Sequence, residues 1–231
     1  MIDPFASYIR PFRLIAIGIS LLMLSASIGF AQLPLVWKST FGNGGGGNDQ
    51  GDFIRTTASG DILVAGIFEG QIDMDQGPSQ TLLTSNGGTD VFIARYATNG
   101  SLIFAKNFGS GLDEHVSGFE VDSSGNFVIA GNFHQIMDCD LGSATSVLQS
   151  NGGTDMFLIS YDNNAILIQA LSFGDAADDE INHMIRQGNM NILITGNCNG
   201  TIDFDPASAA GNVSLPQGGI FMAKLDPVLS N

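Results

Sequence analysis

The chain has 231 residues, 44% of them hydrophobic, and its 23 acidic residues outnumber its eight Lys and Arg residues, for a net charge of −15. Binding to nucleic acid or to an anionic membrane depends on clustered Lys and Arg, so this composition argues against both and against any polyanionic ligand. Divalent cations and neutral sugars are better suited to such a surface.

Residues 1–31 are predicted to be a secretory signal peptide and not part of the fold. Arg10 and Arg13 precede an uncharged apolar run at 14–30, and the small residues Gly29 and Ala31 stand at the positions that a signal peptidase reads. This pattern predicts cleavage after Ala31. The alternative is a retained transmembrane anchor, but 17 residues that include three Ser are short for a span. We therefore expect a secreted or cell-surface protein with no membrane insertion after cleavage, and one domain at 32–231.

The segment at 35–41 matches two later segments, at 102–108 and 167–173, each of which is predicted to be the last strand of a small sheet. The final part of the chain, at 225–231, stops before making such a strand. We therefore expect the N-terminal segment to complete the last sheet, which would hide the edge of that sheet.

The sequence after residue 41 repeats with a period of 65 residues, in three copies. Gly-Gly-Thr-Asp recurs at 87–90 and 152–155, but the third copy loses the acid at 218–221. Equivalent residues form one glycine column and three acidic columns. The columns are Gly66, Gly131 and Gly196; Asp49, Glu114 and Asp179; Asp73, Asp138 and Asp203; and Asp75, Asp140 and Asp205.

Each copy is predicted to form four antiparallel strands, with a short fifth strand and no helix. In the middle copy, Ser124-Gly125-Asn126 separates apolar stretches at 118–121 and 127–133, as a hairpin turn does. A short segment at 136–140 and a polar loop lead to strands at 156–161 and 165–173. The stretch at 127–133 is almost continuously apolar, which predicts a strand covered on both faces.

A repeated four-stranded unit with glycines at its corners is typical of a β-propeller blade, because a lone small sheet must stack on others to bury its faces. We expect an all-β, propeller-like array of three four-stranded antiparallel blades. The predicted blades lie at 42–108, 109–173, and 174–231 with 35–41. The alternative is an all-β solenoid or sandwich.

The middle copy resembles the secreted bacterial β-propeller repeats of the SBBP type. The resemblance is carried by Phe104, Phe108-Gly109, Asp122, Gly125-Asn126, Gly131-x-Phe133, Asp138-x-Asp140 and Gly152-Gly153-x-Asp155-x-Phe157. It covers nearly all of the chain after residue 36, but Cys198 replaces an aromatic residue in the third copy. The resemblance implies a secreted or surface-displayed propeller, in a family whose members mostly have no defined ligand.

Three blades are fewer than the four to eight that close a propeller. The chain is therefore expected to pair with itself in a homo-oligomer that completes a ring, to form an open arc, or to be part of a longer array with further blades. An open blade face would be apolar, which favours assembly or a longer array.

The Asp-x-Asp columns are candidate metal ligands. Asp73 and Asp75, like Asp138 and Asp140 or Asp203 and Asp205, stand two residues apart and so point to one side of an extended segment. Paired carboxylates can hold Ca²⁺, which takes six to eight oxygen ligands. The alternative is that these Asp side chains cap main-chain amides in turns.

Asp49, Glu114 and Asp179 lie in the loops that enter the first strand of each copy. If the blades surround an axis, these three acids form a ring that could bind a cation or the hydroxyl groups of a sugar. The alternative is that they serve only to solvate the loops.

Other reactive residues offer no recognisable site. His115, His134 and His183 occupy different columns, and neither a nucleophile elbow nor a phosphate-binding loop is present. Cys139 and Cys198 replace core residues in different blades, so we expect two buried free thiols and no disulfide.

The sequence therefore predicts a secreted, non-enzymatic repeat protein that acts as a binding or scaffold module, with a carbohydrate or protein ligand at the loops around the axis. The alternative is a cation-dependent glycan hydrolase or lyase that uses the repeated acids.

Overall fold

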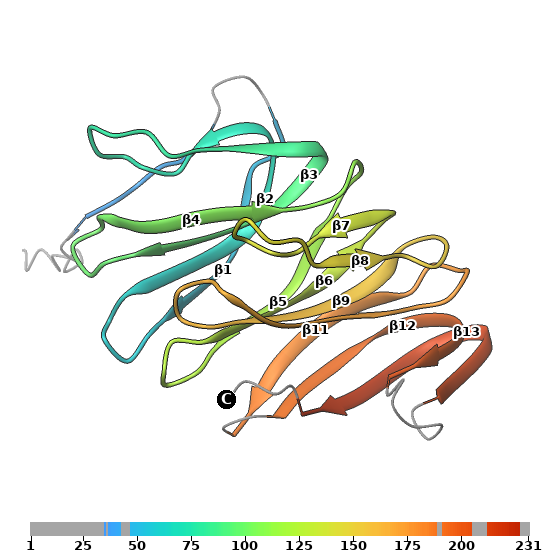
Figure 1. The fold of residues 1–231 in the computed structure, drawn as a ribbon. Coiled ribbons are helices and arrows are strands. Elements are labelled where there is room, and N and C mark those ends of the chain that lie inside the picture. Colours follow the sequence, from blue (N-terminus) through green and yellow to red (C-terminus); the bar gives the residue numbers. More distant parts are fainter. Residues whose placement is uncertain (1–34, 36, 43–46, 189–190, 205–211, 227–231) are drawn as a thin grey trace, which may run out of the picture. The chain divides into compact units, whose positions relative to one another are not determined.

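A computed structural model describes residue 35 and residues 37–42, 47–188, 191–204 and 212–226. These residues form 13 strands in antiparallel sheets and no helix, which confirms the predicted all-β class (Figure 1). Two units are distinguished, Met1–Val36 and Trp37–Asn231, and the description below concerns the second. The predicted signal peptide and Asp205 lie outside the described residues. The part of the chain that the structure covers holds no helix long and apolar enough to cross a membrane.

The first sheet is a meander of β1 (Gln50–Thr56), β2 (Ile62–Asp73), β3 (Leu82–Tyr96) and β4 (Leu102–Phe108), in that order. Gly60 and Gly100 have φ values of 88° and 85°, in the tight turns that join β1 to β2 and β3 to β4. The ends of β2 and β3 continue as a two-stranded ribbon beyond a bulge at Gly70. This sheet matches the four strands predicted for one copy.

The second sheet has the order β10-β9-β6-β5. Its strands are β5 (His115–Val121), β6 (Phe127–Phe133), β9 (Asp155–Tyr161) and β10 (Leu167–Phe173), and a separate ribbon pairs β7 (Ile136–Asp138) with β8 (Val147–Gln149). Every residue of β6 and β9 is buried. The sequence predicted such a doubly covered strand at 127–133, and the structure confirms it.

The second sheet lies between the other two. One apolar core joins it to the first sheet and includes Ile93, Ile129 and Phe157, whereas another joins it to the third sheet and includes Val128 and Leu158. Alternate residues of β6 therefore enter different cores, because successive side chains of a strand point to opposite faces. The described strands form no closed barrel.

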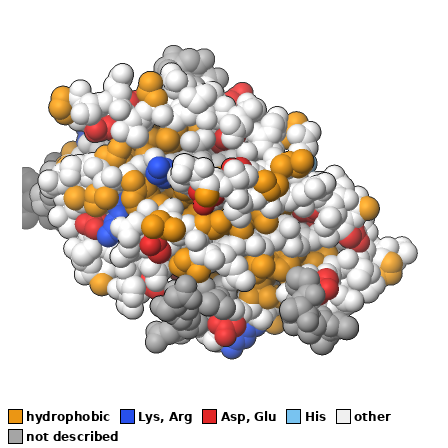
Figure 2. Space-filling model, in the orientation of Figure 1, with side chains coloured by type: hydrophobic (Ala, Val, Ile, Leu, Met, Phe, Trp, Pro, Cys, Tyr) orange, Lys and Arg blue, Asp and Glu red, His pale blue; other side chains and the backbone are white. Residues whose placement is uncertain are grey.

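The third sheet has three strands in the described part of the chain, β11 (Glu180–Gln187), β12 (Asn191–Asp203) and β13 (Asn212–Leu225). Ile220 and Met222 of β13 are 79% and 80% exposed. Figure 2 shows apolar side chains at the surface across the middle and lower part of the view, where Figure 1 draws the second and third sheets.

The predicted fourth strand of the third sheet is not found there. Residues 37–42 form no strand and pack against the first sheet, where the indole Nε1 of Trp37 donates to the carbonyl oxygen of Thr98 at 3.2 Å. Phe41 stacks on Tyr96 with ring centroids 5.6 Å apart. Only the short connection at 42–49 separates this segment from β1, and the second sheet lies between β1 and the third sheet. The segment therefore stays beside the first sheet.

The glycine column has a structural role at the first two strands of each sheet. A Cβ atom at Gly66, Gly131 or Gly196 would overlap the carbonyl oxygen of Gln50, His115 or Glu180, respectively. Each glycine also faces an aromatic ring, that of Phe92, Phe157 or Phe221. Only glycine allows the backbone of the first strand to approach the second so closely.

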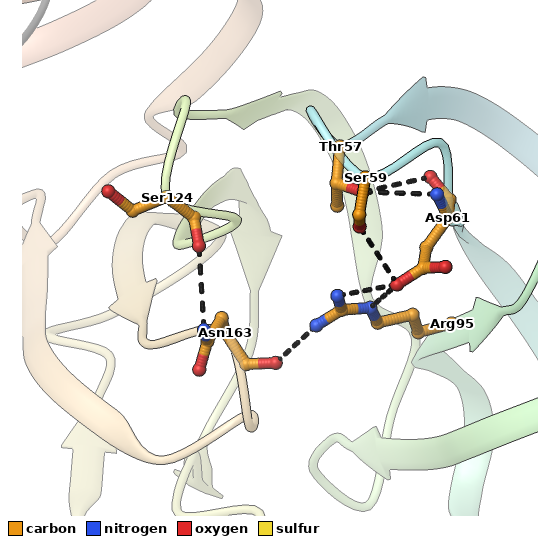
Figure 3. Close-up of polar contacts among 6 residues, drawn as sticks. All are labelled: Thr57, Ser59, Asp61, Arg95, Ser124 and Asn163. Carbon is orange, nitrogen blue, oxygen red and sulfur yellow. Dashed lines mark hydrogen bonds and ion pairs between the residues drawn. The ribbon is translucent and has the colours of Figure 1, made fainter.

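An arginine joins the first two sheets at their turns (Figure 3). Nη2 of Arg95 lies 2.7 Å from a carboxylate oxygen of Asp61, and its Nη1 donates to the carbonyl oxygen of Asn163 at 2.7 Å. Asn163 belongs to the β9–β10 turn, and its side-chain amide donates to the carbonyl oxygen of Ser124 at 3.4 Å. Ser59 and Thr57 complete the β1–β2 turn around Asp61.

Candidate functional site

A cleft of about 770 Å³ lies where the chain enters the first strand of each sheet. All three sheets contribute to its wall, the third through the first residues of β11. The described part of the wall is mostly polar, with acids, imidazoles and amides and no Lys or Arg. The residues that line it are Asn48, Ile67, Glu69, Thr89, Asp113, Glu114, His115, Ser117, Asn132, His134, Thr154, Glu180, Ile181 and Asn182.

The predicted acid ring is engaged in main-chain hydrogen bonds. Asp49 accepts from the N–H of Glu69 at 3.4 Å, and Asp179 accepts from the N–H of Asn199 at 2.9 Å. In both pairs the donor lies 20 residues after the acid, just beyond the glycine column. These carboxylates therefore tie each entry loop to the second strand of its own sheet, and neither of them lines the cleft.

Glu114 does line the cleft, but it is almost fully buried, with 2% of its surface exposed. Its carboxylate accepts from the N–H and the hydroxyl of Ser110 at 2.7 and 2.6 Å. Burial raises the pKa of Glu114 to about 7, against the lowering effect of the Ser110 bonds, and the charge of Asp90 raises it further. A group with this pKa is about half protonated at neutral pH, and it can both donate and accept a proton.

Two further buried acids were not recognised as site candidates from the sequence. Asp90 accepts from the N–H of Asn86 and from the side-chain amides of Asn86 and Asn107. Burial raises its pKa. The recurring Gly-Gly-Thr-Asp was the sequence signal for this position, since Asp90 is its last residue.

Asp155 is the same position in the next copy. It is fully buried, and burial raises its pKa to about 6. One carboxylate oxygen accepts from the N–H of Asn151, but Oδ1 has no hydrogen-bond partner among the described residues. Asp90 and Asp155 thus place one buried acid at each contact between successive sheets.

The Gly-Gly-Thr segments join each sheet to the entry loop of the next. Thr89 donates its N–H to Asp113 at 2.9 Å, and its carbonyl oxygen accepts from the N–H of Glu114 at 2.8 Å. Thr154 makes the same two bonds, with Asp178 and Asp179, at 2.9 and 2.7 Å. A side chain at Gly88 or Gly153 would overlap the carboxylate of Asp113 or Asp178. These bonds hold the wall of the cleft in place.

His134 follows β6 and joins two loops of the second sheet, the one that enters β5 and the one that enters β9. Its Nδ1 lies 3.0 Å from the carbonyl oxygen of Asp113, and its Nε2 lies 3.0 Å from the hydroxyl of Thr154. A carbonyl oxygen only accepts, so Nδ1 is assigned the proton and Nε2 accepts from Thr154. His134 is therefore fully used within the structure.

Several polar cleft side chains have no hydrogen-bond partner among the described residues, and His115, Glu180 and Asn182 are among them. His115 and Glu180 stand in one repeat column, immediately after the acids of the predicted ring, and Gln50 is their counterpart in the first copy. The side chains of this column are an amide, an imidazole and a carboxylate in the three copies, whereas the preceding column of Asp49, Glu114 and Asp179 is acidic in all three. The groups available to a ligand therefore lie one residue beyond the predicted ring.

The Asp-x-Asp pairs lie in loops away from the cleft. Asp73 accepts from the N–H groups of Asp75 and Thr81 at 3.0 and 2.9 Å, and Asp138 accepts from those of Asp140 and Ser146 at 3.1 and 2.9 Å. Asp75 and Asp140 each accept from a glycine N–H two residues later. Asp203 ends β12, where its side chain is exposed. No group of three His, Cys, Asp or Glu suited to a metal ion occurs among the described residues.

The two cysteines are buried free thiols, as the sequence predicted, and the thiol of Cys139 donates to the carbonyl oxygen of Ser146 at 3.0 Å. Burial raises the pKa of both thiols. Neither has the low pKa that marks a reactive cysteine.

No protein-family model matches this chain, and a search of the curated proteins found no match either.

Proposed function

We propose that this protein is an exported, non-enzymatic binding module of the β-propeller type, with its ligand in the cleft where the three entry loops meet. The observation that carries the proposal is the convergence of unpaired polar side chains, His115, Glu180 and Asn182, on a cleft of about 770 Å³. A volume of this size is in the range of small-ligand sites.

The wall of the cleft favours a sugar-like ligand. Among the described residues that line it, Ile67 and Ile181 are the only apolar ones, so an apolar ligand would leave many polar groups unpaired. The lining residues that the structure describes include four acids and no Lys or Arg, which disfavours an anionic ligand. Neutral or amino-bearing oligosaccharides fit this chemistry, because they present hydroxyl and ammonium donors to Glu180 and His115.

The propeller geometry, the SBBP-type resemblance and the export are parts of the same proposal. Support comes from three sheets of similar strand order, from the shared environment of Gly66, Gly131 and Gly196, and from the signal-peptide pattern of residues 1–31. Fractionation of cells that express the full chain tests the export. Mature protein that begins near Gln32, in the medium or at the cell surface, is the expected result.

The test of binding is a screen of the full chain on an array of neutral and amino-bearing oligosaccharides, followed by calorimetric titration of any probe that binds. His115→Ala and Glu180→Gln should each weaken binding by about tenfold, the loss expected for one or two hydrogen bonds. His183→Ala is the matched control, because His183 is also an exposed histidine but does not line the cleft. Absence of binding to every probe, or equal loss in the control, would contradict the proposal.

A second candidate function rests on Glu114. A carboxyl group with a pKa of about 7 at a cleft wall suits the acid of a glycan hydrolase or lyase. Mass spectrometry of the bound oligosaccharides distinguishes the two functions. Cleavage that Glu114→Gln abolishes would favour an enzyme, and intact oligosaccharide after long incubation would favour a binding module. Repeating the incubation with Ca²⁺ and with a chelator tests the cation dependence expected from the sequence.

A further inference from the structure

The third sheet differs from the other two in its outer edge. β4 pairs with β3 in the first sheet and β10 pairs with β9 in the second, whereas no described strand pairs with the outer edge of β13. An unpaired edge carries a row of free N–H and carbonyl groups, which is a template for another strand.

The third sheet also leaves one face open. Val128 and Leu158 of the second sheet are buried against the third, and Leu63 and Ile93 of the first are buried against the second. In the third sheet Leu193 corresponds to Val128, and Met222 corresponds to Leu158. The second match holds because Phe157 and Phe221, each one residue earlier, pair with equivalent glycines of the column. Met222 is 80% exposed, and its neighbour Ile220 is 79% exposed. The face that two sheets bury is therefore uncovered on the third.

The first sheet has its open face on the other side, the side that the second sheet turns toward the first. Ile54, Ile62 and Val64 correspond to Phe119, Phe127 and Ile129, which fill the core between the first two sheets. Here they line an apolar hollow of about 180 Å³ together with Tyr96 and residues of the segment at 37–42. Ile54 is 64% exposed, whereas Phe119 is fully buried.

The segment at 37–42 packs on the first sheet as the end of a preceding sheet's fourth strand would. The ends of β4 and β10 pack on the next sheet in the chain in this manner. Phe108 ends β4 and packs on Phe157 of the next sheet, with ring centroids 5.7 Å apart, and Phe173 ends β10 and packs on Phe204 at 5.4 Å. Phe41, the corresponding residue of this segment, also packs against the sheet that follows it, in the cluster that contains Phe92 and Tyr96. A glycine follows each of these phenylalanines: Gly42, Gly109 or Gly174.

We propose that two copies of this chain associate head to tail. The open face of β11–β13 of one copy covers the outer face of the first sheet of the other, and residues 37–41 of the latter pair with the free edge of β13. This contact reuses the two faces that already pack within the chain, so the apolar surfaces match without rearrangement. The contact is heterologous, so two copies can close a ring of six sheets, and any other rotation gives a longer ring or a filament.

The register of the added strand follows from the internal copies. Phe108 and Phe173 pair with Val91 and Met156, and the residues two positions before them, Lys106 and Leu171, pair with Ile93 and Leu158. In the proposed contact Phe41 therefore faces Ile220, and Ser39 faces Met222.

Light scattering of the full chain over a range of concentrations gives the first test. The mass should be a multiple of the monomer mass, and Met222→Glu should raise the concentration for half-dissociation more than about tenfold. Met222 is exposed, so this change should leave the fold intact, which circular dichroism checks. Ile136→Glu is the matched control, because Ile136 is an apolar residue that is 59% exposed on the β7–β8 ribbon, outside the two sheets that the proposal joins. A monomer at every concentration, or an oligomer unaffected by Met222→Glu, would overturn the proposal.

A cysteine pair tests the register. Ser39→Cys with Met222→Cys should form a disulfide between chains on mild oxidation, visible as dimer on a non-reducing gel. Thr40→Cys with Met222→Cys should not, since neighbouring residues of a strand point to opposite faces. A bridge within one chain, or equal cross-linking by Met222→Cys alone, would exclude the head-to-tail arrangement.

Discussion

The carboxylates of Asp90 and Glu114 meet at Gly109, between the first and second sheets. A Cβ atom on this glycine would lie 2.5 Å from Oε2 of Glu114 and would also overlap the carboxylate of Asp90. Two buried acids this close cannot both be charged without cost, and the charge of Asp90 contributes to the raised pKa of Glu114.

The stability of the protein should fall as the pH rises from about 4.5 to about 7. A buried acid with a raised pKa folds more favourably when it is protonated, so its contribution is complete below the unfolded pKa and is lost as the pH passes the folded pKa. For Glu114 the change from 4.5 to about 7 corresponds to about 3 kcal/mol. Asp155, with a pKa of about 6, acts in the same direction. Urea unfolding at a series of pH values measures the effect.

Glu114→Gln separates the contribution of this residue. The amide mimics the protonated acid, so the variant should be more stable than the wild type at pH 8 and should show a flatter pH dependence. Glu180→Gln is the control, because Glu180 is exposed. An unchanged pH profile in Glu114→Gln would show that Glu114 is ionised in the folded protein throughout this range.

Asp90 and Asp155 should respond differently to replacement by asparagine. Both oxygens of Asp90 accept hydrogen bonds, so an amide nitrogen there would face a donor and Asp90→Asn should cost about 1–3 kcal/mol. Oδ1 of Asp155 has no partner among the described residues, so Asp155→Asn can place its amide nitrogen there at little cost. Unfolding at pH 8 tests the difference, and equal losses would contradict it.

Gly131→Ala should destabilise the fold by about 3 kcal/mol or more, because the new methyl group would overlap the carbonyl oxygen of His115 and the ring of Phe157. Gly51→Ala is the matched control, since no atom lies within 4 Å of a Cβ atom built there. Thermal unfolding of both variants measures the effect. Similar melting temperatures would mean that the first two strands are not as close as the structure has them.

Arg95→Ala should weaken the contact between the first two sheets by about 1–3 kcal/mol. Its side chain is largely buried, and it makes charge-assisted bonds to Asp61 of its own sheet and to the carbonyl oxygen of Asn163 across that contact. Arg55→Ala should cost less, about 0–1 kcal/mol, because the Arg55–Glu120 pair is more exposed. Chemical unfolding of the two variants provides the comparison, and a larger loss for Arg55→Ala would refute it.

Much of the fold was predictable because strands and turns leave local patterns. The continuous apolar run at 127–133 predicted a strand buried on both faces, and β6 is one. Local patterns could not place the segment at 35–41. Its sequence suits a fourth strand, but its position depends on how far the third sheet lies from β1.

The site was predictable only in part. All three sheets contribute to one cleft, but Asp49 and Asp179 bind main-chain N–H groups 20 residues away, which no spacing within a loop reveals. An acid at the same position of every copy is expected if the acids form a ligand-binding ring, and it is equally expected if each acid makes the same structural hydrogen bond. The repeat pattern therefore does not distinguish the two roles. The variable column of Gln50, His115 and Glu180 was overlooked because it has no common chemistry.

The most direct test of the central claim, that three equivalent sheets pack face to face around one axis with the cleft at one end, is a crystal structure of the full chain. We expect the rotation that superposes the first sheet on the second to superpose the second on the third about the same axis. Gly66, Gly131 and Gly196 should then lie at equal distances from that axis. Two rotations about different axes, or glycines at unequal distances, would contradict the claim.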